Sequence, residues 1–140
     1  MLSGRIEDGW GKGVKACVST RGQLVTAPLE FSTFYNVKAE AAATGYNLVP
    51  PKTGKRFVIT DIMLYANKNV GAADATVDLY EASSTTSTTV DTSILNTEML
   101  KQTTLALTGL NIIVTEGKWV NVKTDDDDIF ANIAGYYVDA

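Results

Sequence analysis

Short segments in which apolar and polar residues alternate constrain most strongly how this chain can fold. Neighbouring side chains of a strand point to opposite faces, so a period of two indicates strands rather than helices. The alternation is visible in residues 14–20, and it returns in residues 23–27 after a turn at Arg21-Gly22. This pattern predicts a β-hairpin close to the N-terminus.

Later segments repeat the alternation and are separated by turn residues. Five more strands are predicted, at residues 55–69, 75–82, 105–114, 118–124 and 128–138. In the strand at 75–82, Val77 and Leu79 are expected to face inward. Asp78 and Tyr80 would then face outward.

Two intervening segments have a different character. Residues 83–93, "SSTTSTTVDTS", are too polar to bury much surface and predict an exposed loop. Residues 93–103 carry the one helical signal, because Leu95 and Met99 recur at helical spacing behind Ser93 as a cap.

A length of 140 residues fits one domain with a single core. Closely spaced strands with almost no helix indicate an all-β fold. We therefore predict a single-domain β-sandwich of the jelly-roll or Greek-key type, with at most one short helix. The domain is expected to span residues 14–140, behind a glycine-spaced flexible arm at residues 1–13.

The strand predicted at 55–69 is apolar on both of its faces. One expected face consists of Phe57, Ile59, Met63 and Tyr65, and the other of Val58, Ile62, Leu64 and Ala66. A strand of an antiparallel sheet with one wet face should alternate more cleanly, so this strand is expected to be covered on both sides. We predict that the face with Phe57 contacts a neighbouring subunit.

The charge balance and the missing residue types exclude several functions. With 12 Lys and Arg against 16 Asp and Glu, the net charge is −4, so nucleic acid is not an expected ligand. The chain has no histidine and a single cysteine, Cys17, which excludes an intrachain disulfide, a Cys/His zinc site and a Ser-His-Asp triad. We predict a protein that is not an enzyme and has no catalytic residue and no cofactor.

Targeting signals are not apparent in the sequence. No segment approaches the roughly 20 apolar residues that cross a bilayer. The N-terminus lacks the basic start and apolar core of a secretion signal. We expect synthesis in the cytoplasm and no membrane association.

Four consecutive aspartates, Asp125 to Asp128, lie between the last two predicted strands. Calcium takes six to eight oxygen ligands, usually from alternating residues. Adjacent aspartates of an extended segment point to opposite sides, so at most two of these four would share one ion. The pattern predicts a solvated acidic turn and no metal site within one chain, and it leaves open a cation held between subunits.

The N-terminal "GWGKGVK" has a superficial likeness to a phosphate-binding loop. Its spacing fits neither the P-loop nor the dinucleotide motif, and it precedes a strand rather than a helix. We predict instead an arm that binds a partner, with Ile6 and Trp10 as apolar anchors and Lys12 beside them.

Aromatic residues leave a second class of function open. Five aromatic residues could line a glycan-binding surface, namely Tyr65, Tyr80, Trp119, Tyr136 and Tyr137, although strand propensity and core packing select the same residues. A small glycan hydrolase would need two carboxyl groups about 5 to 9.5 Å apart in a cleft. No acidic residue stands out in the sequence for that role.

Four segments give the chain a family resemblance that extends from about Val14 to Val138. They are "KACVSTRGQLVTAPLEFS", "YNLVPPKTGKRFVITDIMLYANKNVG", "LTGLNIIVTEGKWVNVKT" and "AGYYV". Together they resemble small virion structural proteins of tailed bacteriophages. The shared motifs are structural, so the resemblance carries over no catalytic residue.

The resemblance implies a capsid decoration, or cement, protein. Such a subunit would form homotrimers on the outside of the phage head and stabilise it, with the N-terminal arm on the major capsid protein or another virion protein. The alternative is a tail or receptor-binding module that recognises a host surface glycan. Both readings place the protein in the virion after synthesis in the host cytoplasm.

Overall fold

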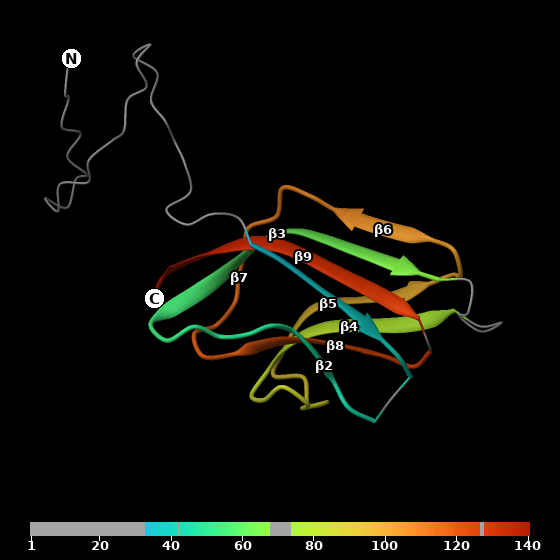
Figure 1. The fold of residues 1–140 in the computed structure, drawn as a ribbon, viewed down its shortest axis with the longest axis horizontal. Helices are drawn as coiled ribbons and strands as arrows, with labels where there is room; N and C mark the ends of the chain where they lie inside the picture. The colour runs from blue at the N-terminus through green and yellow to red at the C-terminus, as the bar shows by residue number, and fades with distance from the viewer. Residues whose placement is uncertain (1–32, 42, 68–73, 127) are drawn as a thin grey trace, which may run out of the picture.

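The structure is a computed structural model that describes residues 33–41, 43–67, 74–126 and 128–140 (Figure 1). The strands are β1 (Thr33–Ala39), β2 (Tyr46–Val49), β3 (Lys55–Ala66), β4 (Ala75–Ala82), β5 (Thr92–Met99), β6 (Thr104–Leu107), β7 (Ile112–Ile113), β8 (Trp119–Thr124) and β9 (Ile129–Asp139). These residues form no helix, and the all-β prediction is confirmed. Within the same ranges, no helix has the length and apolar character needed to cross a membrane.

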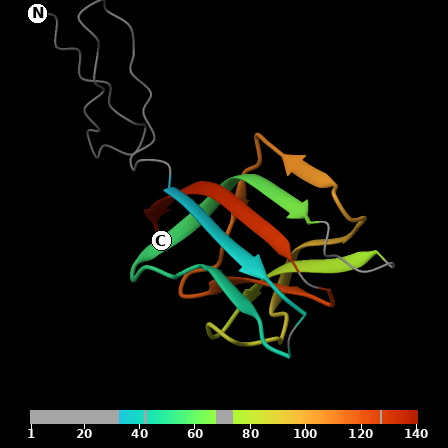
Figure 2. The same ribbon diagram turned by 45° about the vertical axis from the view of Figure 1, so that its right-hand side comes forward.

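The strands form two antiparallel sheets that face each other (Figures 1 and 2). The five-stranded sheet has the order β1-β9-β3-β6, with β7 also paired to β3. The four-stranded sheet has the order β2-β8-β4-β5. From β1 to β4 each connection crosses from one sheet to the other.

The core lies between the sheets and is formed by alternate side chains of each strand. Its largest fully buried members include Ile133 and Tyr137 of β9, Ile59 and Leu64 of β3, Leu79 of β4 and Val122 of β8. Gly135 of β9 also faces this layer, because a Cβ there would lie 2.2 Å from the carbonyl oxygen of Val58 and 2.6 Å from the Phe57 ring. Only glycine allows the two backbones and this ring to approach so closely.

A β-bulge in β3 explains why this strand is apolar on both predicted faces. The pairing with β9 shifts between Ile59 and Asp61. An extra residue reverses the alternation, so that Phe57 and Ile59 lie on the same inner face as Ile62. Most of the apolar residues of β3 therefore face one core, and the strand does not need a cover on each side along its length.

The predicted helix is wrong, because residues 92–99 form strand β5 along the edge of the four-stranded sheet. Leu95 lies opposite Leu79, and Met99 lies opposite Ala75. A spacing of four residues fits the period of a strand as well as that of a helix, so Leu95 and Met99 reach the core from either structure. Ser93 pairs with Tyr80 in the sheet and caps nothing.

The remaining strand predictions agree with the structure at most positions. The segments at 75–82, 118–124 and 128–138 correspond to β4, β8 and β9. The segment at 105–114 is divided into β6 and β7 by a turn at Gly109, whose φ is 68°. The hairpin predicted at 14–27 and the arm at 1–13 lie outside the described residues.

Candidate interaction surface

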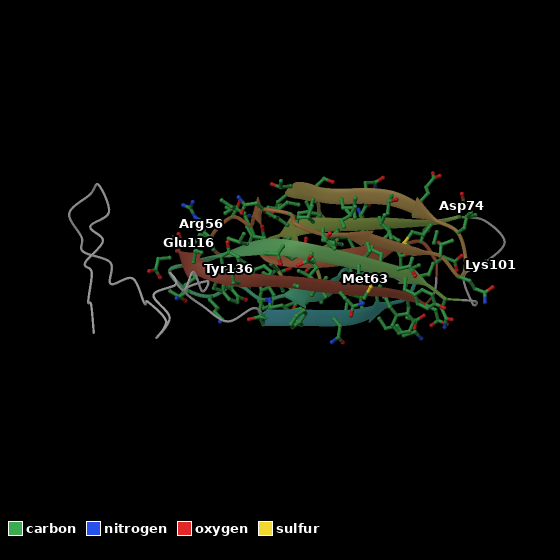
Figure 3. The ribbon with its side chains drawn as sticks, turned by 90° about the horizontal axis from the view of Figure 1, so that it is seen from above. Arg56, Met63, Asp74, Lys101, Glu116 and Tyr136 are labelled. Carbon is green, nitrogen blue, oxygen red and sulfur yellow. The ribbon has the colours of Figure 1, made fainter. Side chains whose placement is uncertain are left out.

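The outer face of the five-stranded sheet carries a group of uncovered apolar side chains, which we call the apolar outer face. Figure 3 looks onto this face, with Met63 near its centre. Its members are Phe34 of β1, Met63 and Tyr65 of β3, Ala106 of β6, and Phe130 and Ala134 of β9. Phe34 is 76% exposed, Met63 47% and Tyr65 37%. Large apolar side chains exposed side by side on one sheet are typical of a surface that binds a partner.

The strand register places these side chains in rows across the sheet. Tyr65 lies opposite Phe130, and their ring centroids are 6.2 Å apart. Phe34 lies opposite Ala134 in the neighbouring pair of strands. The rows place large aromatic rings next to small side chains, so the rings protrude from the surface and the alanine positions are recessed.

The central row of the apolar outer face contains two amides and a thioether. Asn132 of β9 lies opposite Asn36 on one side and opposite Met63 on the other. An amide donates and accepts hydrogen bonds, and a methionine side chain adapts its shape to a partner. This row can therefore form specific polar contacts within an apolar surrounding.

A charged cluster borders the apolar outer face at the end of β1. The Lys38 ammonium forms ion pairs with Asp128 and Glu40. Hydrogen bonds to Asp128 and then Glu40 raise the pKa of Lys38 well above its usual range. The ammonium also lies 6.0 Å from the centre of the Phe130 ring, within the range of a cation–π contact.

The aspartate turn holds strands together through its first and last members. The Oδ1 atom of Asp125 accepts a hydrogen bond of 2.7 Å from the backbone N–H of Thr76. Asp128 is buried and has a φ of 60°, and its carbonyl accepts a hydrogen bond of 3.1 Å from the backbone N–H of Asn67. Asp127 lies outside the described residues.

The turn also lacks the clustering that a cation site requires. Among residues 33–41, 43–67, 74–126 and 128–140, no three Cys, Asp or Glu side chains are grouped so that they could hold a metal ion. Asp128 is paired with Lys38, and Asp125 caps the start of β4. Two of the four aspartates thus have roles within the fold, in contrast to the purely solvated turn that we expected.

The outer face of the four-stranded sheet is polar, and the chain covers part of it. This polar outer face consists of Asn47 of β2, Asp78 and Tyr80 of β4, Asn96 of β5, and Asn121 and Lys123 of β8. The backbone of the Ser/Thr loop, residues 83–91, lies against it. Asn121 donates hydrogen bonds to the carbonyl oxygens of Ser84, at 2.9 Å, and Ser87, at 3.2 Å.

Tyr80 shows how completely the Ser/Thr loop covers this part of the sheet. Its side chain faces outward as predicted, yet it is 0% exposed. Its hydroxyl donates a hydrogen bond of 2.7 Å to the carbonyl oxygen of Ser87. Burial raises the pKa of the Tyr80 phenol, and the charge of Asp78 adds to this shift while a hydrogen bond with Asn121 opposes it.

The loop is held at its base by a small charged network. Lys118 donates hydrogen bonds to Asp91, at 2.7 Å, and to the Ser83 hydroxyl, at 3.0 Å. The Lys118 ammonium and the Ser83 hydroxyl together hold the pKa of Asp91 below its usual range.

A shallow depression beside the polar outer face is lined by Thr76, Asp78, Lys123, Thr124 and Asp125. Its two carboxylates already have partners. Asp78 pairs with Lys123 at 3.3 Å and accepts a hydrogen bond from Asn96. Asp125 accepts from Thr76, so both carboxylates serve to join neighbouring strands.

The structure divides the predicted interface residues between the two faces of β3. Met63 and Tyr65 belong to the apolar outer face, whereas Phe57 and Ile59 are buried in the core. The bulge after Ile59 causes this division. The three residues predicted for the arm, Ile6, Trp10 and Lys12, lie outside the described residues.

Sequence reasoning missed Phe34, Phe130 and Ala134 as surface residues. A signal for the first was present, because "TFYNVKA" in β1 alternates, with Phe34 and Lys38 on one side and Tyr35 and Val37 on the other. Alternation alone does not show which side of an edge strand faces the core. In β1 the side with Tyr35 and Val37 packs on the core, and Phe34 is exposed.

No protein-family model matches the chain, and no curated protein matches it. The surface chemistry described above is therefore the basis for a functional proposal.

Proposed function

We propose that this protein is a non-enzymatic structural subunit of a tailed-bacteriophage virion, and that it acts by binding other protein surfaces. In this proposal it decorates the outside of the head as a homo-oligomer and stabilises the shell. The observation that carries the proposal is the apolar outer face, on which Phe34, Met63 and Tyr65 are exposed on one side of the same sheet. Burial of such side chains between subunits is the main favourable contribution to protein association.

The rest of the described chain supports a role in binding. Its buried side-chain nitrogen and oxygen atoms all have hydrogen-bond partners. The acidic residues with the clearest contacts, Asp78, Asp91 and Asp128, are each paired with a lysine. A fold whose buried polar atoms all have hydrogen-bond partners, and whose outer face exposes apolar side chains, suits a rigid subunit that binds other proteins.

The resemblance implies a homotrimer that contacts the major capsid protein through residues 1–13, and we retain the arm contact as part of the proposal. Removal of these residues is expected to release the protein from particles. Truncated protein that decorates particles as well as the intact chain would exclude the arm contact.

Recognition of a host glycan by a tail or receptor-binding module is the weaker proposal. Of the five aromatic residues predicted for a glycan surface, Tyr80 and Tyr137 are buried, Trp119 and Tyr136 are half-buried, and Tyr65 is exposed. Tyr137 instead donates a hydrogen bond of 2.7 Å to the carbonyl of Pro50. A sugar would therefore find one well-exposed ring of the five, Tyr65 beside Phe130.

The proposal is tested by mass spectrometry of density-purified phage particles from cells that produce this chain. The expected result is that the chain is one of the abundant proteins of the particle, and labelled antibodies should bind to heads. If the chain stays in the soluble fraction and is absent from purified particles, it is not a virion subunit. Antibody labelling confined to tails would exclude the decoration role and favour the tail module.

A further inference from the structure

We propose that the apolar outer face binds the same face of a second copy of this chain, about a twofold axis that runs along β9. The proposal deepens the virion role and rests on it for the setting in which the contact is used. It also replaces the trimer implied by the resemblance with a dimer, because face-to-face packing about a twofold axis closes after two copies.

The first argument is the unequal cover of the two sheets. The chain uses the Ser/Thr loop to bury Tyr80 on the polar outer face, where hydrogen bonds to Ser84 and Ser87 hold the loop in place. In the described residues no comparable segment covers Phe34 or Met63, which remain 76% and 47% exposed. Within the described residues these side chains have no cover, which leaves the face open to a second copy.

The second argument is that the face is complementary to itself. A twofold axis along β9 brings Asn132 of one copy over Asn132 of the other, and two amides can pair because each donates and accepts. The same rotation exchanges β1 with β3, because both strands pair with β9. Lys38 then lies over Tyr65 of the second copy, and Asn36 lies over Met63.

The exchanged contacts bring no like charges together. An ammonium over an aromatic ring gives a cation–π contact, and Lys38 already lies 6.0 Å from the neighbouring Phe130 ring. The Phe130 rings of the two copies meet on the axis. Asp61 lies over Phe34 of the second copy and Lys38 lies over Tyr65, so neither charge meets a charge of the same sign.

The size of the face predicts a weak contact. Strand spacings of about 4.8 Å and residue spacings of about 3.4 Å give β1, β9 and β3, the strands that overlap under this rotation, a shared footprint of roughly 350 Å² per copy. Two copies would bury about 700 Å², which is less than the 1,200 Å² or so of a standard stable interface. The dimer should therefore depend on concentration in solution, and become stable where many copies are held close together on one particle.

The experiment is light scattering on the purified full-length chain over a range from about 1 µM to about 1 mM, which covers weak affinities. We expect the mean mass to rise from the monomer value of 15.0 kDa toward twice that value. Met63→Lys should keep the mass at the monomer value throughout. The matched control, Thr85→Lys, makes the same charge change on the exposed Ser/Thr loop and should dimerise like the natural chain.

Three results would overturn the proposal. They are a natural chain that stays monomeric throughout, a Met63→Lys variant that dimerises like the natural chain, and a trimer that persists in this variant. Circular dichroism identifies a variant that fails to fold, and Asn132→Lys then provides a second test, because the rotation about β9 brings these two like charges together. A chain that is present on particles but monomeric in solution at every concentration would refute this contact and leave the virion role standing. A chain that dimerises but is absent from particles would refute the virion role and leave the contact standing.

Discussion

The outer faces of the two sheets differ in how far their large side chains are covered by the chain itself. On the four-stranded sheet, a large aromatic residue, Tyr80, is buried by the chain's own loop. On the five-stranded sheet, Phe34 and Met63 have no such cover within the described residues. A side chain that points away from the core can therefore still be buried, as Tyr80 is. A partner is expected on the face whose apolar side chains stay exposed.

Replacing an aromatic residue by alanine should affect stability very differently on the two outer faces. Tyr80→Ala should lower the free energy of unfolding by about 3 to 5 kcal/mol, because it empties a buried site and removes one of the two donors to the carbonyl of Ser87. Phe34→Ala should change it by less than about 0.5 kcal/mol, because the ring is mostly exposed. Urea unfolding of both variants measures the contrast, and similar losses in the two would contradict the assignment of covered and bare faces.

A smaller effect should follow from crowding the Ser/Thr loop with a substitution at Gly45, which lies outside the loop in the sequence. A Cβ at Gly45 would lie 2.4 Å from the Tyr80 hydroxyl oxygen and 2.6 Å from the Ser87 carbonyl oxygen. Gly45→Ala should therefore displace the loop and cost about 1 to 3 kcal/mol, as overpacking commonly does. Hydrogen exchange should be faster at the backbone N–H of Asp91, which bonds to the carbonyl of Glu81. If exchange there is unchanged, the loop is not held by this contact.

Removal of the Tyr80 hydroxyl alone should have the mildest effect on stability, with a clear pH signature. Tyr80→Phe loses one hydrogen bond, so we expect a cost of about 1 kcal/mol near neutral pH. Burial raises the pKa of Tyr80 above its unfolded value of about 10. The neutral phenol therefore stabilises the fold fully below about pH 10, and this contribution is lost as the pH rises through the folded pKa.

Alkaline unfolding then distinguishes the two proteins. Between about pH 9 and about pH 12, the natural chain should lose more stability than Tyr80→Phe, which has no phenol to ionise at this position. The comparison is made by urea unfolding at each pH. Parallel losses in the two proteins would show that the Tyr80 phenol is not buried under the loop.

The sequence was a good guide to where strands occur and a poorer guide to which way they face. Alternation located β4, β8 and β9 because each carries a regular inward set such as Val120 and Val122. In β3 it failed after Ile59, because a bulge depends on the pairing with β9 and leaves no local mark in the sequence. For that reason the sequence analysis placed Phe57 and Met63 on the same face of the strand and predicted both as interface residues.

Tertiary contacts decide the two other differences. Leu95 and Met99 are spaced to suit a strand or a helix, and pairing with β4 selects the strand. The cover on Tyr80 comes from hydrogen bonds between backbone carbonyls of the Ser/Thr loop and a side chain of β8, Asn121. The composition of residues 83–91 correctly indicated a polar loop, but it contains no information on where the backbone lies.

The central claim is that the apolar outer face closes against a partner, and Met63 reports on it directly. Peroxide converts an accessible methionine to its sulfoxide. Met63 is 47% exposed, whereas Met99 is buried and serves as an internal reference. The measurement is the rate of oxidation of each residue, followed by mass spectrometry of peptides, as the concentration of the chain is raised. The account predicts that Met63 becomes protected as copies associate while Met99 stays unreactive, and an unchanged rate at Met63 in a chain that has associated would contradict it.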